Sequence, residues 1–437
     1  MSAGQIDCTS LSADRRPKIA TGQQLPLSFI CLTLIFVLYP LFLLSWLKGM
    51  VILTTASFVV IVMTDVIINR RSLFFTNRVG VILLFYMLPM ISFAWSKTPA
   101  DTFFRSIIPA VNFAIFYISL HASKYGREEI IGKISIIVPM YFCFISVCIF
   151  SIFGSFRNSS REMAELLGSY SNHSTSIVLM CLPFLIVLAS RVGFGLNLPT
   201  ISIISCILTT ILSQSRAGIV ILLGVLIFFP VFIGGSRIHG LKRLVGILAI
   251  SAPVTVLVIV GAGFENTIGG VAQRTASSQV GEALLGDGLD YREADLARAA
   301  MYVFGIEMII EHPIVGTGFG GLYHFMLERI AFGVVSHNLI ITFWGELGLI
   351  GMVVLLYFFF RITLDAYQLR TVQFDLPIEK LMPAACLCCI LVFVVYGMVR
   401  PFYSNYMFPV MLGYLVHALA ERKKLFAANP HRKSSDR

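Results

Sequence analysis

Long uninterrupted apolar runs dominate this sequence of 437 residues and limit the folds open to it. A helix needs about 20 consecutive apolar residues to cross the hydrocarbon core of a bilayer. Runs of about that length recur along most of the chain, at residues 26–47, 49–68, 79–96, 103–121, 134–153, 174–190, 199–213, 217–235, 243–262, 338–360, 381–399 and 402–420. The sequence therefore predicts an all-α polytopic membrane protein with about 12 transmembrane helices, because helices satisfy their own backbone groups within lipid.

The composition supports the same class of protein. Hydrophobic residues make up 57% of the chain and charged residues 13%, whereas an ordinary soluble domain has about 45–50% and about 25%. So few charged residues cannot coat a globule, which excludes soluble, disordered and fibrous proteins. We interpret the net charge of +10 as basic loops on the cytoplasmic side and expect no nucleic-acid partner. Most of the nine cysteines lie in apolar runs, where a thiol behaves as a small hydrophobic group.

The distribution of basic residues predicts how the chain crosses the membrane. With both termini in the cytoplasm, about two thirds of the 33 Lys and Arg residues fall on the inner side. In the one large outer loop, residues 289–311 have helical spacing and His312-Pro313 ends the helix, so we expect a small helical cap. This topology predicts an N-terminal tail (1–25), nine spans (26–262), the outer loop (263–336), three further spans (337–420) and a C-terminal tail (421–437).

Three polar residues stand out because this topology brings them to the same outer interface. Arg216 lies between two spans, where its planar guanidinium could bind a phosphate or simply extend to the interface. Arg298 lies on the loop helix, one turn before Tyr302 on the same face, and could equally be a surface charge. His337 begins the tenth span; histidine exchanges protons near neutral pH, but polar residues are also common at helix starts.

Together, two fixed positive charges and one base suit a diphosphate leaving group and a hydroxyl nucleophile. Glu346 follows His337 by nine residues and points to the opposite helix face, so we interpret it as a structural partner for another span. Arg400 is a further candidate phosphate contact, with interfacial anchoring as the alternative. The sequence contains no evident metal-ligand set, and we expect neither a metal ion nor another cofactor.

Three segments share their order and spacing with one known family. They are a Ser-x-Ser-Arg-x-Gly segment ending at Gly218; Arg298 with an aromatic four residues later, then Glu307, His312-Pro313, Gly316 and Gly318; and His337-Asn338 with Glu346, Gly348 and Gly351. The pattern covers about residues 200–355 and resembles the O-antigen ligase family, which also contains Wzy-type polysaccharide polymerases and exopolysaccharide production proteins. Tyr302 stands where the family usually has tryptophan, and residues 168–174 match the family pattern only loosely.

This resemblance implies a GT-C-like, metal-independent glycosyltransferase of the bacterial inner membrane, with its active site at the periplasmic face. Its donor would be a glycan on undecaprenyl diphosphate, and its acceptor either a lipid A core sugar or another lipid-linked repeat unit. Arg216 and Arg298 would bind the donor diphosphate, and His337 would act on the acceptor or help to place it. Polysaccharide assembly or export proteins would be further partners.

Other functions remain open at this point. A ligase and a polymerase differ in the acceptor, which the sequence does not identify. A flippase for lipid-linked oligosaccharides would bind the same donor without making a bond. It would need polar residues and broken helices near the bilayer centre, whereas the strongest polar positions here gather at one edge. A non-catalytic scaffold for polysaccharide assembly would tolerate substitution of those positions.

Overall fold

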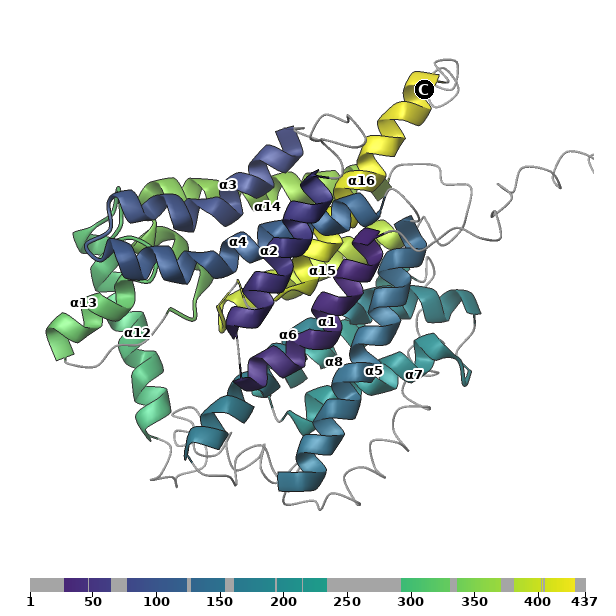
Figure 1. Cartoon of the computed structure of the whole chain (residues 1–437), viewed down its shortest axis with the longest axis horizontal. Helices are drawn as coiled ribbons and strands as arrows, with labels where there is room; N and C mark the ends of the chain where they lie inside the picture. Colours follow the sequence, from purple (N-terminus) through teal and green to yellow (C-terminus); the bar gives the residue numbers. More distant parts are fainter. Residues whose placement is uncertain are drawn as a thin grey trace, which may run out of the picture.

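The computed structural model describes residues 27–45, 47–63, 77–123, 127–153, 161–192, 195–213, 215–233, 292–330, 336–370, 381–401, 403 and 405–428. Within these ranges every regular element is helical (Figure 1), which confirms the all-α prediction for this part of the chain. The predicted ninth span, the first part of the outer loop (263–291) and the N-terminal tail lie outside the described residues.

The helices follow one another as α1 (Leu27–Ser45), α2 (Leu47–Met63), α3 (Asn77–Ile91), η2 (Ser92–Ala94), α4 (Pro99–Ala122), α5 (Arg127–Phe153), α6 (Arg161–Val192), α7 (Leu198–Leu212), α8 (Arg216–Ile233), α12 (Arg292–Glu311), α13 (Gly321–Ile330), η4 (Ile341–Glu346), α14 (Gly348–Arg370), α15 (Met382–Gly397) and α16 (Met407–Ala428). Five segments are long and apolar enough to cross a membrane: Asn77–Ala94, Pro99–Ala122, Ile131–Ser151, His173–Val192 and Gly348–Leu369. The chain is thus a multi-pass membrane protein, and the count of about 12 spans stays a prediction.

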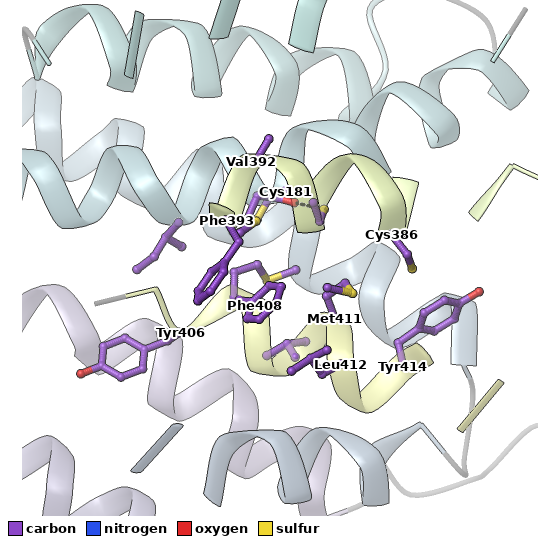
Figure 2. Packing of buried hydrophobic residues seen from close by; sticks show 14 of the residues in the cluster. Cys181, Cys386, Val392, Phe393, Tyr406, Phe408, Met411, Leu412 and Tyr414 are labelled. Carbon is purple, nitrogen blue, oxygen red and sulfur yellow. Dashed lines mark hydrogen bonds between the residues drawn. The ribbon is translucent and has the colours of Figure 1, made fainter. Parts of the chain in front are cut away.

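Aromatic and sulfur-containing side chains fill the space between the helices. The Phe85 ring of α3 stacks on the Phe358 ring of α14, with 3.9 Å between ring centroids. Phe393 of α15 stacks in the same way on Phe408 of α16, at 3.7 Å (Figure 2). The thiol of Cys389 is buried and donates to the carbonyl of Met180 in α6, at 3.2 Å. These contacts tie α15 to both α16 and α6.

The segment that leads into α14 differs from the continuous helix expected over residues 338–360. Residues 341–346 form η4, a π-helical turn, and α14 begins only at Gly348, whose φ is +72°. A Cβ atom at Gly348 would lie 2.3 Å from the carbonyl oxygen of Ile314, so glycine permits the loop before α13 to approach this closely. The next residue, Leu349, donates its N–H to the carbonyls of Pro313 and Ile314, both at 3.0 Å. The segment between α12 and α13 is therefore joined directly to the start of α14.

Candidate functional site

The carbonyl oxygen of Met398, at the end of α15, joins two of the segments that the sequence analysis selected. It accepts one hydrogen bond from the hydroxyl of Tyr302 on α12, at 3.3 Å, and another from Nδ2 of Asn338, at 3.2 Å. The neighbouring His337 donates its backbone N–H to the sulfur of Met301, also on α12, at 3.2 Å. The loop helix and the His337-Asn338 segment therefore meet at the end of α15. We call this meeting point the α15 junction.

The start of α8 lies at the same junction. The side chain of Ser215, the residue before α8, lies beside that of Tyr396 near the end of α15, and the charge of Arg400 acts on the same tyrosine. The hydroxyl oxygen of Ser215 also accepts the N–H of Gly218, at 3.2 Å, and so caps the first turn of α8. Arg216, the first residue of α8, therefore starts its helix next to the residues that follow α15.

The remaining residues of the Ser-x-Ser-Arg-x-Gly segment fix the turn between α7 and α8 against α6. The hydroxyl of Thr175 in α6 donates to the hydroxyl of Ser213, at 2.7 Å. A Cβ atom at Gly218 would lie only 2.4 Å from Cγ2 of Thr175. A hydroxyl at position 213 and glycine at 218 thus let this turn pack closely on α6, which explains the residue types of the segment.

Two of the predicted diphosphate ligands are described through their backbones alone. Arg216 opens α8, and Arg298 lies in α12 one turn before Tyr302, about 6 Å along the helix axis. The side chains of both arginines lie outside the described residues. Tyr302, one turn after Arg298, binds the carbonyl of Met398. Ser215, the residue before Arg216, lies beside Tyr396. The backbones of both arginines are therefore near the α15 junction. The binding roles of the two arginines stay predictions.

His337 lies half-buried at this junction, and its neighbours cap the helix that follows. The Oδ1 atom of Asn338 accepts the N–H groups of Ile340 and Ile341, at 2.8 and 3.1 Å. The hydroxyl of Thr342 donates to the hydroxyl oxygen of Ser336, at 2.9 Å. The capping that the sequence analysis considered for this segment is therefore present, and Asn338 supplies the capping oxygen. These bonds hold the backbone of His337 on both sides.

Glu346 binds the start of α13 and also lies near a span, since it lines one cavity with Arg105 of α4. Its buried carboxylate accepts the N–H groups of Gly320 and Leu322 at the start of α13, at 2.9 and 3.4 Å. Its backbone carbonyl accepts the N–H of Gly318, at 2.8 Å. Burial raises the pKa of Glu346, which lies just before the α14 span, to about 7, although these backbone hydrogen bonds and the charge of Arg105 oppose the shift. The start of a helix suits a carboxylate because unpaired N–H groups point outward there.

The structure adds a polar cavity that the sequence analysis missed. The cavity measures about 10 Å³, room for roughly one water molecule, and is lined by Arg105, Phe319, Gly320, Ser336, Thr342, Glu346 and Tyr403. Arg105 of α4 donates to the carboxylate of Asp101, at 2.6 Å, and its guanidinium carbon lies 4.9 Å from the centre of the Tyr323 ring. A lone arginine in the predicted span over 103–121 was the available signal. For Tyr403 the sequence offered no comparable signal.

Among the described residues, no group of three or more His, Cys, Asp and Glu side chains lies close enough to hold a metal ion. The described polar side chains that come together at the α15 junction are the hydroxyls of Tyr302, Ser215 and Tyr396 and the amide of Asn338, with Arg400 close by. Such groups can bind an anion and orient a sugar hydroxyl.

Comparison with known proteins adds one match. Residues 201–356 match the model of a family described as O-antigen ligase, and no curated protein matches the chain. The matched range contains Arg216, Arg298, His337 and Glu346, whereas Arg105 and the residues after α15 lie outside it. The match supports a role in surface polysaccharide biosynthesis and a glycosyltransferase type of enzyme. The resemblance predicted from the sequence is therefore confirmed: residues 201–356 of this membrane protein are similar to the O-antigen ligase family.

Proposed function

We propose that this protein is a membrane glycosyltransferase that moves a glycan from undecaprenyl diphosphate to a sugar hydroxyl at the periplasmic face. The observation that carries the proposal is the α15 junction. There the carbonyl of Met398 binds both Tyr302 and Asn338, while Ser215 lies beside Tyr396. Three segments of the family pattern therefore meet at this junction, although more than 100 residues of chain separate Gly218 from His337.

In this proposal the arginines bind the diphosphate of the donor. Arg216 and Arg298 each supply a planar guanidinium that can bind two phosphate oxygens at once. Arg400, at the same junction, adds a third positive charge. Fixed positive charges stabilise the charge that develops on a leaving diphosphate without help from a divalent ion. The proposed reaction therefore requires no metal ion.

His337 acts on the acceptor. The acceptor oxygen forms a bond to the anomeric carbon of the donor glycan while the bond from that carbon to the diphosphate oxygen breaks. The leaving undecaprenyl diphosphate keeps the electron pair of the broken bond, and the imidazole of His337 takes the proton of the acceptor hydroxyl. The capping bonds of Asn338 and its bond to Met398 hold the backbone next to this imidazole in place. A lipid A core sugar and a second lipid-linked repeat unit both supply the hydroxyl that this step needs.

A reconstituted assay tests the proposal. The purified protein is supplied with a lipid-diphosphate glycan and either a core-lipid acceptor or a second repeat unit, with a chelator present. We expect Arg216→Ala, Arg298→Ala and His337→Ala to lower transfer by about 100-fold or more, since each removes a group aimed at the transition state. Arg329→Ala is the matched control, because Arg329 is ion-paired with Glu311 on the exposed side of α12 and α13.

Each outcome of this assay bears on a different part of the proposal. The product size separates a ligase, which adds one chain to a core lipid, from a polymerase, which lengthens the lipid-linked chain. Transfer that stops on addition of chelator would contradict metal independence. Normal transfer by all three variants would remove the basis of the site. Movement of the donor across a vesicle membrane without any new glycosidic bond would favour the flippase.

A further inference from the structure

One face of α12 exposes large apolar side chains although this helix belongs to the predicted outer loop. Val303 is 63% exposed, Ile306 56% and Ile310 73%. At about 100° per residue these three positions lie within one narrow sector of the helix. The opposite sector carries Met301 and Met308, which are buried in a cluster with side chains of α13 and η4. The exposed residues therefore form a stripe, and water is a poor surrounding for a stripe of this kind.

Polar groups border this stripe on both sides. On one side the hydroxyl of Tyr302 binds the carbonyl of Met398 at the α15 junction. On the other side Glu307 and Glu311 pair with Arg329 of α13, at 3.4 and 2.6 Å. A helix with an apolar stripe between polar borders is typical of a helix that lies in the plane of a membrane surface.

Beyond α12 the chain returns to a membrane-spanning helix that also exposes apolar side chains. After α12 the chain exposes Ile314 and then meets the start of α14, where Leu349 donates to the carbonyl of Ile314 at 3.0 Å. Leu349 and Ile350 are exposed, and the apolar exposed face extends along α14 through Val353. Because α14 contains the candidate span Gly348–Leu369, this face of α14 contacts lipid. The α12 stripe is thus an extension of a lipid-facing surface.

The arrangement of the helices agrees with this continuity. In Figure 1, α12 and α13 lie at one end of α3, α4 and α14, and α12 runs across the direction of those three helices. A helix that crosses the ends of membrane spans lies roughly parallel to the membrane surface. Its exposed stripe can then extend past the bundle over the adjoining leaflet.

We infer that α12 is an interfacial helix whose Val303, Ile306 and Ile310 side chains insert among the lipid chains of the leaflet next to the candidate site. The occupant of the stripe is the bilayer itself, because the stripe joins the lipid-facing side of α14 at Leu349. This contact does not depend on the proposed reaction. It places the Tyr302 border of α12, and with it the α15 junction, at the level of the lipid headgroups.

Quenching by brominated lipids tests the inference on the full-length protein in vesicles. A tryptophan is introduced as Ile306→Trp, and as Glu328→Trp at an exposed position on α13 for control. The three native tryptophans are accounted for by subtracting the emission of the wild-type protein. For Ile306→Trp we expect brominated acyl chains to reduce the added emission by about half or more, and for Glu328→Trp by much less.

Equal quenching of the two reporters, or none at either, would overturn the inference. If Ile306→Trp does not insert into vesicles, Ile310→Trp reports on the same stripe. A second copy of the chain is the competing occupant, and it predicts a different result. In that case the reporter would be shielded from brominated lipid, and Ile306→Lys would convert a dimer to a monomer in sedimentation. Strong quenching together with an unchanged mass for Ile306→Lys would exclude that occupant.

Discussion

The α15 junction and the polar cavity are adjacent, yet they are built in different ways. Both include the segment around His337: Asn338 binds Met398 at the junction, while Ser336 lines the cavity. The junction brings together Tyr302 and Asn338, two residues of the sequence pattern, at the carbonyl of Met398. The cavity gathers Arg105, Glu346 and Tyr403, and its main hydrogen bonds run from the backbone N–H groups of a glycine-rich turn to Glu346.

This difference separates two tasks. The groups proposed to touch substrate belong to segments that meet at the junction: Arg216 begins α8, Arg298 lies one turn before Tyr302 in α12, and His337 precedes Asn338. The groups around the cavity are tied to one another, as Arg105 is to Asp101 and Glu346 is to Gly320. Their contacts hold α13 and the turn before it on α4 and η4. We therefore expect changes at the junction to affect transfer most, and changes at the cavity to affect stability most.

The largest expected effect tests this division directly. Arg216→Ala should lower transfer by about 100- to 1000-fold, because in the proposed site it removes a charge that binds the leaving diphosphate. Arg105→Ala should keep transfer within about tenfold of wild type, and should cost about 1 kcal/mol of stability because its partner Asp101 is partly exposed. Initial rates and thermal unfolding of both variants provide the comparison. The opposite pattern, with Arg105 essential and Arg216 dispensable, would move the site to the cavity.

A smaller effect is expected at the start of α14. Gly348→Ala forces an alanine into φ +72° and places a Cβ atom 2.3 Å from the carbonyl oxygen of Ile314. We expect a loss of at least about 2 kcal/mol of stability, since both the backbone strain and the clash must be relieved. Gly224→Ala in α8 is the control, because nothing lies within 4 Å of its added Cβ. Similar unfolding temperatures for the two variants would contradict the close approach of loop and helix.

Glu346 provides the third comparison. Glu346→Ala leaves the N–H groups of Gly320 and Leu322 without their acceptor, which should cost about 1–3 kcal/mol. Glu346→Gln keeps one acceptor oxygen and should lose less. Thermal unfolding in detergent ranks the two variants, and protease cleavage after α13 reports on the attachment of the loop. A loop that stays fully protected in Glu346→Ala would show that the carboxylate is not the anchor.

The last comparison is a dependence of stability on pH. Because burial raises the pKa of Glu346 from 4.5 to about 7, the folded protein holds this proton to a higher pH than the unfolded chain does. The stabilisation that protonated Glu346 gives the folded protein is therefore fully present below pH 4.5. It decreases as the pH rises from 4.5 to about 7 and is lost above about 7. The unfolding temperature of Glu346→Gln should change less between pH 5 and pH 8 than that of the wild-type protein. An identical slope in the two proteins would argue against this titration.

Particular residues show how far the sequence alone could be interpreted. The apolar runs predict the helical membrane class because lipid imposes length and composition on every span, and His337-Asn338 stands out as a polar pair at a helix start. Arg105 could not be assigned, since a single arginine near the end of an apolar run fits an interfacial anchor as well as a buried ion pair. The partners of Glu346 were hidden because they are backbone groups, which every residue except proline carries.

The attachment of Glu346 to the main chain has a consequence for sequence variation. Since Gly320 and Leu322 bind the carboxylate through N–H groups, the side chain of Leu322 is not needed for that bond. The path of the backbone matters instead, and the positive φ of Gly320, +82°, keeps glycine at that position. Homologous chains can therefore diverge around this turn and still retain the same tether, provided that the acid and the glycines persist.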